Sequence, residues 1–256
     1  FILDIETGAL IRKLDTVTGS AGSPNGLTTP RGWDRDGNGT LDVIYVGDRL
    51  GNVWKFDVSS SDPSAWGPSL GTVAAPVPLF QAKDSSGNPQ PITGGISVGV
   101  NARKGDANFG KLYVFFGTGQ YLLSSDVTDK SVQSWYGLID TGTQIPDRSV
   151  LKQRTITTES TISGSSVRAF SLATAADMVG KRGWYIDLLP PSGAAGERIT
   201  GDNKFFGSVL LATSIIPSND ICKPGGESFL NAIDPFTGAA LTSVFFDVNG
   251  DSKFTS

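Results

Sequence analysis

Residues 43–57 read VIYVGDRLGNVWKFD, and this stretch decides the fold class. Its first part, 43–48, is rich in β-branched and aromatic residues, which favour strands. A short turn that contains Gly51 follows, and residues 52–57 carry the alternating pattern of a half-buried strand. Two strand-like runs joined by a short glycine-containing turn are typical of a β-hairpin. We therefore expect paired antiparallel strands at 43–48 and 52–57.

Strand-like runs recur along the whole chain, and the run at 111–123 predicts a second hairpin. They lie at 111–123, 134–140, 183–188, 207–213 and 228–234. Asp-x-x-Thr-Gly turns at 4–8 and 234–238, and a shorter version at 140–142, introduce further expected strands at 9–14 and 239–246. An Asp side chain closes such a turn on its own backbone, and glycine supplies the positive φ. We interpret this approximate repeat as the outer hairpins of propeller blades.

The composition indicates the same fold class. The 32 glycines and 14 prolines among 256 residues suit many short strands joined by turns. Only residues 172–179, ended by Gly180, favour a short helix. We expect one all-β domain over residues 1–256, a modified β-propeller of antiparallel blades or most of one. At roughly 40–50 residues per blade, this length holds about five or six blades.

The absence of histidine excludes several kinds of chemistry. With no histidine and only Cys222, the chain offers no Ser-His-Asp or Cys-His relay and no zinc site made of His or Cys ligands. We therefore predict that the chain is not an enzyme. A net charge of −4 without a basic cluster disfavours nucleic acid as a partner. We interpret Cys222 as a buried thiol or as one half of a disulfide to a segment outside this sequence.

The sequence offers no transmembrane helix, because no run of 18 apolar residues occurs in it. The chain begins at Phe1 inside a strand-like run, and its only methionine is Met178. We therefore expect an internal or processed piece of a longer protein, with any signal or anchor upstream.

The strongest motif is DRDGNGTLD at residues 34–42. Oxygen-bearing side chains stand at positions 1, 3, 5 and 9 of this loop, and glycine stands at position 6, where an EF-hand loop turns sharply. The expected metal ligands are Asp34, Asp36, Asn38, Thr40 through its backbone carbonyl, and Asp42. An EF-hand adds a glutamate at position 12, but Tyr45 stands there inside a strand, so Asp42 has to close the shell. A plain polar turn is the alternative, and the alternate register of four oxygen residues favours calcium over it.

A second copy of the pattern stands at the end of the sequence. Its candidate ligands, at positions 1, 3, 5, 7 and 9, are Asp247, Asn249, Asp251, Lys253 and Thr255. Position 12 would lie beyond Ser256, so the sequence stops inside this loop. We leave open whether it is a complete calcium site.

The five tryptophans allow two interpretations. Trp33, Trp54, Trp66, Trp135 and Trp184 either form a platform for a sugar or a quinone, or pack the blades together. Aromatic residues on strands usually fill the core, so we favour packing.

Residues 30–57, which read PRGWDRDGNGTLDVIYVGDRLGNVWKFD, resemble the calcium-loop blade of the PilC/PilY family of type IV pilus tip-associated adhesin and biogenesis proteins. GTGQYL at 117–122 is similar to a hairpin of that family, as is KRGWYIDL at 181–188 with GER at 196–198. Residues 222–238 also fit. The motifs occur in the family's order, and the resemblance covers nearly the whole chain.

The resemblance implies the C-terminal β-propeller of a large secreted protein. Such proteins lie at the bacterial cell surface, at the outer membrane and the pilus tip, with tip (minor) pilins and host-surface receptors as partners. They promote pilus assembly, oppose retraction, and mediate adhesion and twitching motility. Calcium in the propeller loop regulates that balance, so the resemblance implies Ca²⁺ held by the 34–42 loop.

Two other classes stay open. A quinoprotein dehydrogenase is also a calcium-dependent propeller rich in tryptophan, but the sequence lacks a vicinal cysteine pair and a catalytic base near the loop. A scaffold propeller would bind a protein partner and use calcium only as structural support.

Overall fold

The computed structural model describes residues 1–218 and 226–247. Of these described residues, 37% lie in strands and 4% in helices, which confirms the expected all-β class. The helices in these ranges are short 3-10 turns: η1 (Pro63–Ala65), η2 (Ser124–Val127) and η3 (Arg148–Val150). None of the helices in the described ranges is long and apolar enough to cross a membrane.

The first large sheet contains the hairpin that was expected at 43–57. Its strands, in spatial order, are β3 (Arg31–Trp33), β4 (Val43–Gly47), β5 (Asn52–Asp57) and β6 (Gly67–Pro68), with β7 (Phe80–Gln81) also paired to β5. β4 and β5 are antiparallel, with Val46 opposite Trp54. Gly51 has a φ of 79° and its N–H donates to the carbonyl of Asp48 at 3.1 Å, which closes the turn. The hairpin prediction is confirmed.

The second large sheet shows that the hairpin expected at 111–123 is only half right. Its strands, in spatial order, are β11 (Lys152–Arg154), β14 (Gly183–Asp187), β10 (Ser134–Asp140), β9 (Leu112–Gly117) and β8 (Ser97–Val100). β9 forms, but it pairs with β8 and β10, and residues 119–123 form no strand. The backbone groups of that segment instead bond to the side chains of Asp126 and Arg198.

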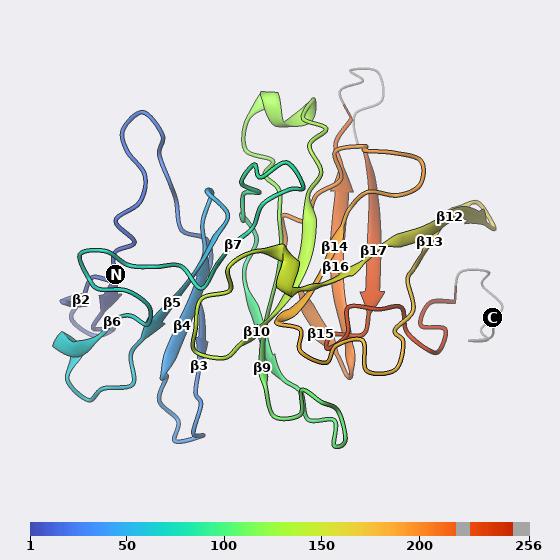
Figure 1. The fold of residues 1–256 in the computed structure, drawn as a ribbon. Helices are drawn as coiled ribbons and strands as arrows, with labels where there is room; N and C mark the ends of the chain where they lie inside the picture. The colour runs from blue at the N-terminus through green and yellow to red at the C-terminus, as the bar shows by residue number, and fades with distance from the viewer. Residues whose placement is uncertain (219–225, 248–256) are drawn as a thin grey trace.

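The remaining strands form one smaller sheet and two separate hairpins. The sheet consists of β15 (Lys204–Phe206), β16 (Val209–Ile216) and β17 (Glu227–Ile233), and the hairpins are β1 (Ile2–Leu3) with β2 (Leu10–Arg12) and β12 (Ile156–Ile162) with β13 (Ser165–Phe170). Figure 1 shows the sheets in a row that does not close into a ring. The described residues thus contain three sheets of three or more strands, not five or six blades. Insertions such as the one between β10 and β14 take up the difference.

Two local expectations are wrong. Residues 172–179 form turns and no helix, because Asp177 accepts a hydrogen bond from the Thr174 N–H at 3.0 Å and pairs with Arg154. Residues 239–246 form no strand. There the Ala240 N–H donates to the Ser171 carbonyl at 3.0 Å, so this segment bonds to a loop and not along β17.

The hydrophobic core lies between neighbouring sheets. One cluster joins the first and second sheets and includes Tyr45, Val53, Phe80, Phe116 and Tyr136. Another joins the second and third sheets and includes Tyr113, Trp135, Trp184, Leu210 and Ile233.

Three of the five tryptophans are buried and satisfied within the protein. Trp54, Trp135 and Trp184 donate their indole N–H groups to Asp48 Oδ2 at 2.8 Å, to Asn203 Oδ1 at 2.6 Å and to the Pro235 carbonyl at 2.7 Å. They therefore pack the sheets, as expected, while Trp33 and Trp66 are half-buried.

Candidate metal centre

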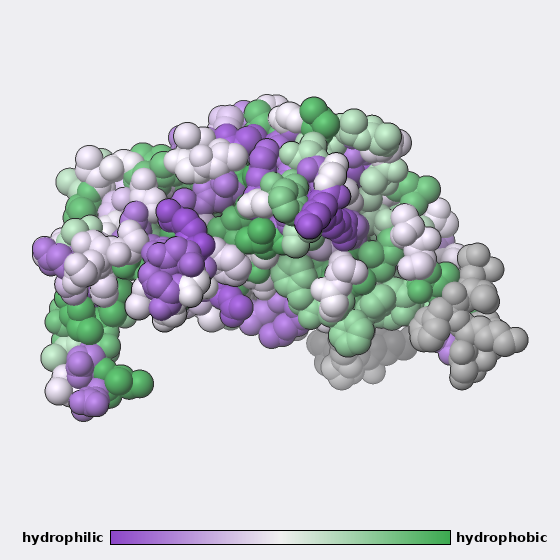
Figure 2. All heavy atoms as spheres, turned by 90° about the horizontal axis from the view of Figure 1, so that it is seen from below, coloured by the Kyte–Doolittle hydropathy of each residue, from purple (hydrophilic) through white to green (hydrophobic). Residues whose placement is uncertain are grey.

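The loop of residues 34–42 connects β3 to β4 at one end of the first sheet (Figure 1). Seen from below, this loop projects as a hydrophilic cluster on the left of the molecule (Figure 2). Carboxylate oxygens of Asp34, Asp36 and Asp42 all lie within 4.8 Å of one another. Among residues 1–218 and 226–247, no other three acidic, His or Cys residues converge in this way. Three carboxylates at such distances repel one another unless a cation neutralises them.

Glycines at two positions let the chain wrap around Asp34. Gly37 and Gly39 have φ values of 76° and 90°, which side chains with a Cβ rarely adopt. Their N–H groups donate to Asp34 Oδ1 at 2.7 Å and to Asp34 Oδ2 at 2.8 Å. The hydrogen bond from Gly39 is the main reason why the pKa of Asp34 lies below its ordinary value. Asp34 is therefore an anion that the loop itself orients.

Asp42 ties the loop to the sheet. It is buried, its N–H donates to the Trp33 carbonyl at 3.0 Å, and its own carbonyl accepts from the Val58 N–H at 2.8 Å. Its Oδ2 accepts the N–H of Arg35 at 2.7 Å. The backbone of the residue that was expected to close the metal shell is thus held by β3 and by the residue that follows β5, while its carboxylate is held by the Arg35 N–H.

Asn38 and Thr40 interact with each other. Asn38 Oδ1 accepts from the Thr40 N–H at 2.8 Å and from Thr40 Oγ1 at 2.5 Å. Asn38 Nδ2 donates to Asp36 Oδ2 at 3.0 Å. The structure therefore brings the three aspartates together, while the side-chain oxygen of Asn38 faces Thr40. The carboxylate donors are hard oxygen ligands, so the set fits calcium better than a soft metal.

The second candidate loop lies almost entirely outside the described residues. Asp247 is the last described residue, and Asn249, Asp251, Lys253 and Thr255 fall beyond it. Cys222 also lies outside the described ranges.

A buried polar cluster lies between the first and second sheets and was not predicted from the sequence. Asp140 Oδ2 on β10 accepts from Tyr45 Oη on β4 at 2.5 Å and pairs with Lys55 Nζ on β5 at 2.7 Å. Burial alone raises the pKa of Asp140, but the hydrogen bonds from Lys55 and Tyr45 lower it below its ordinary value. Burial is the main reason why the pKa of Tyr45 is raised, and the negative charge of Asp140 raises it further. The cluster links the sheet that carries the loop to the next sheet. The only sequence signal was the turn at 140–142.

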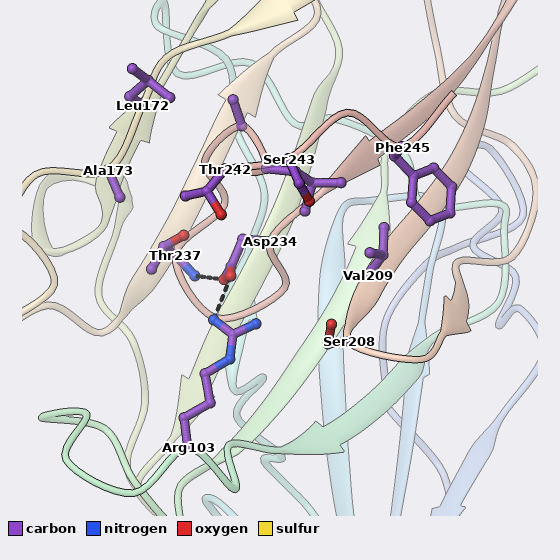
Figure 3. A pocket seen from close by; sticks show the side chains of 12 residues that line it. Arg103, Leu172, Ala173, Ser208, Val209, Asp234, Thr237, Thr242, Ser243 and Phe245 are labelled. Atoms are coloured by element: carbon purple, nitrogen blue, oxygen red, sulfur yellow. Dashed lines mark hydrogen bonds and ion pairs between the residues drawn. The ribbon is translucent and has the colours of Figure 1, made fainter. Parts of the chain in front are cut away.

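A separate cavity of about 600 Å³ lies beside the expected turn at 234–238 (Figure 3). Asp234 Oδ1 accepts the N–H groups of Phe236 and Thr237 at 3.0 Å each, which confirms the expected Asp-closed turn. Asp234 also forms an ion pair with Arg103 in the cavity. Apolar side chains and hydroxyl groups make up the rest of the lining.

Comparison with known proteins places these features in a family. A family model described as the PilY1 beta-propeller domain matches residues 1–160. A type IV pilus biogenesis factor PilY1 homolog of Xylella fastidiosa is 43% identical over 229 residues, which are 89% of this chain and 17% of that protein. Type IV pilus biogenesis factor PilY1 of Pseudomonas aeruginosa PAO1 is 33% identical over an alignment of 279 positions, gaps included. That alignment spans 96% of this chain and 23% of that protein.

A solved structure agrees with the sequence relatives. The crystal structure of the Pseudomonas aeruginosa PilY1 C-terminal domain matches with a TM-score of 0.77 and 29% identity, and it covers 99% of this chain and 56% of that one. This chain thus spans about a fifth of the length of the curated relatives and about half of the solved domain. On this basis, the chain belongs to the PilY1 beta-propeller family of type IV pilus biogenesis factors.

Proposed function

We propose that this chain is the calcium-binding propeller region of a type IV pilus biogenesis factor, and that calcium regulates its action. The observation that supports calcium most directly is the convergence of the Asp34, Asp36 and Asp42 carboxylates within 4.8 Å. Its place in the cell would be the bacterial surface, at the outer membrane and the pilus tip, outside the cell. Its partners would be tip (minor) pilins and host-surface receptors.

Five residues would hold the ion. The ligands would be the carboxylates of Asp34, Asp36 and Asp42, the side-chain oxygen of Asn38 and the backbone carbonyl of Thr40. Asn38 would have to release its hydrogen bonds to Thr40 first. The ion would supply positive charge that offsets the repulsion among the three carboxylates. Calcium fits better than magnesium, because the loop contains glycine and offers several oxygen ligands, whereas magnesium demands a tight octahedron.

The effect of the ion would be local. Asp42 contacts β3 through Trp33 and the end of β5 through Val58, so the ion would fix the loop against these two strands. Trp33 packs against the core between the first and second sheets, but that core includes none of the loop residues 34–42. Calcium would therefore order one end of the first sheet and leave the fold unchanged. A reversible local change of this kind suits a regulator of pilus extension and retraction, adhesion and twitching motility.

A calcium titration with two readouts tests regulation against mere structural support. The full-length protein is titrated while its melting temperature and its binding to purified pili are measured. Regulation predicts that both change over the same calcium range, and that Asp42→Ala removes both changes. Asp62→Ala is the matched control, because Asp62 closes an exposed turn by accepting the Ser64 N–H at 2.8 Å. A melting shift without any change in pilus binding would leave calcium as structural support only.

The proposal assigns no catalytic role. The relatives are named as biogenesis factors, and the buried tryptophans pack the sheets. Turnover of alcohols or sugars by the purified protein with added quinone and calcium would contradict this.

A further inference from the structure

One candidate ligand, Asn38, is followed directly by a glycine, and an Asn-Gly pair has a chemistry of its own. The backbone nitrogen of the glycine can attack the side-chain amide of the asparagine, because no Cβ hinders its approach. Such pairs stand at 25–26, 38–39 and 249–250, and the third lies outside the described residues. The two described pairs have different surroundings, and these surroundings predict which pair reacts first.

The loop prepares the side-chain carbonyl of Asn38 for attack. Asn38 Oδ1 accepts two hydrogen bonds from Thr40, one from its N–H at 2.8 Å and one from its Oγ1 at 2.5 Å. The side chain therefore reaches forward past the Gly39 peptide, which contains the attacking nitrogen. Negative charge develops on Oδ1 during the attack, and the two donors would stabilise that charge as an oxyanion hole does.

The attacking residue is open to solvent. The loop projects as a hydrophilic cluster (Figure 2), and Asn38, Gly39 and Thr40 are all exposed. A Cβ at Gly39 would meet no atom within 4 Å, so no neighbouring side chain blocks the reaction. The Gly39 N–H donates to Asp34 Oδ2 at 2.8 Å, so its hydrogen is directed at an acceptor and not at the Asn38 side chain.

The pair at 25–26 lacks this preparation. Asn25 is half-buried, and its Oδ1 is buried without a hydrogen-bond partner among the described residues. Its Nδ2 donates to Asp48 Oδ2 at 2.7 Å and to Thr18 Oγ1 at 2.8 Å. Asn38 Nδ2 has a single acceptor, Asp36 Oδ2 at 3.0 Å. At Asn25 no donor stabilises charge on the oxygen, and two acceptors retain the nitrogen that has to leave.

We propose that Asn38 deamidates spontaneously, so that the loop modifies its own candidate ligand set. The Gly39 nitrogen forms a bond to Cγ of Asn38 and gives its proton to solvent hydroxide. The side-chain nitrogen takes up a proton from water and leaves as ammonia, and a five-membered succinimide ring remains. One water molecule then opens the ring at either carbonyl and yields aspartate or isoaspartate. No oxidant or reductant takes part.

Both products alter the loop. Aspartate places a fourth carboxylate at position 5 of the pattern. Isoaspartate, the usual major product, also inserts one carbon atom into the main chain. This carbon displaces Thr40 and Asp42 relative to Asp34, so the alternating ligand set would lose its register. The loss of calcium binding rests on the proposed function, whereas the deamidation itself does not. Asn38 would thus limit how long the calcium response of each molecule lasts.

Ageing followed by peptide mapping tests the proposal. The full-length protein is incubated without calcium at mildly alkaline pH, under conditions in which circular dichroism shows that it stays folded. Mass spectrometry follows the gain of one dalton at each Asn-Gly pair, and an isoaspartate methyltransferase labels the isoaspartate product. Asn38 should react at least about tenfold faster than Asn25.

Three substitutions separate the chemistry of the loop from its sequence. Thr40→Val removes the hydroxyl donor but keeps the side-chain shape, so Asn38 should react more slowly, while Asn25 in the same molecule is the internal control and should keep its rate. Thr40→Ser retains a hydroxyl and should react as the wild type does. Asn38→Gln keeps an amide but cannot close a five-membered ring, so its peptide should gain no mass over the same period.

A separate measurement follows the effect on calcium. Anion exchange separates aged protein by its added negative charge, and the calcium-dependent melting shift is measured for each fraction. The unreacted fraction should keep the shift, and the isoaspartate fraction should lose it. An isoaspartate fraction with the full shift would contradict the expected loss of register. If fresh protein shows no shift, the proposed calcium function fails, while the mass gain still decides the deamidation.

Two results would overturn the deamidation proposal. One is an Asn38 amide that stays intact while Asn25 reacts, or that reacts only as fast as Asn25. The other is an unchanged rate at Asn38 in Thr40→Val, which would show that the donors to Oδ1 do not activate this side chain.

Discussion

Asp42 is the residue at which a polar loop meets a buried strand. Its backbone bonds to Trp33 and Val58, and its carboxylate bonds to the Arg35 N–H and lies within 4.8 Å of the other two aspartates. One side chain thus has a structural contact and a candidate ligand role. The two roles can be separated, because asparagine keeps an oxygen that accepts the Arg35 N–H but carries no charge.

Asp42→Asn should therefore abolish most of the calcium-dependent stabilisation and leave the melting temperature without calcium close to that of the wild type. Stabilisation by a bound ion follows mass action and amounts to about 2.7 kcal/mol at a hundredfold excess over Kd. Thermal unfolding with and without calcium measures both quantities. An undiminished calcium shift in Asp42→Asn would show that this charge has no part in binding.

Gly39→Ala should destabilise the protein by about 1 kcal/mol and weaken calcium binding, because the added Cβ disfavours the φ of 90° at this position. The space around a Cβ at Gly39 is open, so the effect would come from the backbone conformation and not from a clash. Gly22→Ala is the control, since Gly22 has an ordinary φ and equally open surroundings. Denaturant unfolding compares the two, and equal stabilities would contradict the role given to Gly39.

At the scale of elements, the insertion between β10 and β14 is held by an ion pair. Arg154 at the end of β11 donates to the Asp177 carboxylate at 2.7 and 3.0 Å, and this is the main reason why the pKa of Asp177 falls to about 2. A lowered folded-state pKa stabilises the fold fully above the ordinary value of 3.8, and this stabilisation is lost as the pH falls through about 2.

Asp177→Asn should lower the melting temperature at neutral pH and reduce the further loss of stability between about pH 4 and pH 2. Melting curves across this range measure the slope. If the variant loses stability on acidification as steeply as the wild type, the ion pair does not account for the acid sensitivity of this region.

β10 and β14 pack through a glycine placed opposite a tryptophan. Gly137 pairs with Trp184, and a Cβ at Gly137 would lie 2.4 Å from the Trp184 ring. Gly137→Ala should therefore cost about 1–3 kcal/mol by overpacking. Gly201→Ala, in open space, is the control. Denaturant unfolding followed by tryptophan fluorescence measures the difference, and a Gly137→Ala protein as stable as the control would contradict this packing.

For the whole molecule, local patterns predicted well and long-range arrangements did not. The β4–β5 hairpin and the loop at 34–42 follow from turn residues and side-chain alternation, which act over a few positions. The loop after β9 was taken for a strand, because the Arg198 side chain that holds it comes from 78 residues further along the chain. The described residues contain three sheets of three or more strands, fewer than the five or six blades that the length can hold, because insertions cannot be told from blades by length alone. The link from Tyr45 to Asp140, 95 residues apart, left no pattern in the sequence.

The large sheets and the clusters between them form without any contribution from the 34–42 loop. Removal of calcium should therefore loosen one end of the first sheet while the sheets persist. Circular dichroism of the protein with and without a chelator should show the same strand signal, and loss of that signal on chelation would contradict a local role for the ion.

Isothermal titration calorimetry with calcium tests the central claim most directly. Three proteins are compared, and all of them carry Asp247→Ala, which disables the second candidate loop. The first has no other change and is here called the wild type. The second carries Asp34→Ala/Asp42→Ala, and the third carries the control change Asp62→Ala. A site at residues 34–42 predicts binding by the wild type and by the Asp62 control, and no binding by the Asp34→Ala/Asp42→Ala protein, which should remain folded. Calcium binding by a folded Asp34→Ala/Asp42→Ala protein with the affinity of the wild type would contradict the assignment.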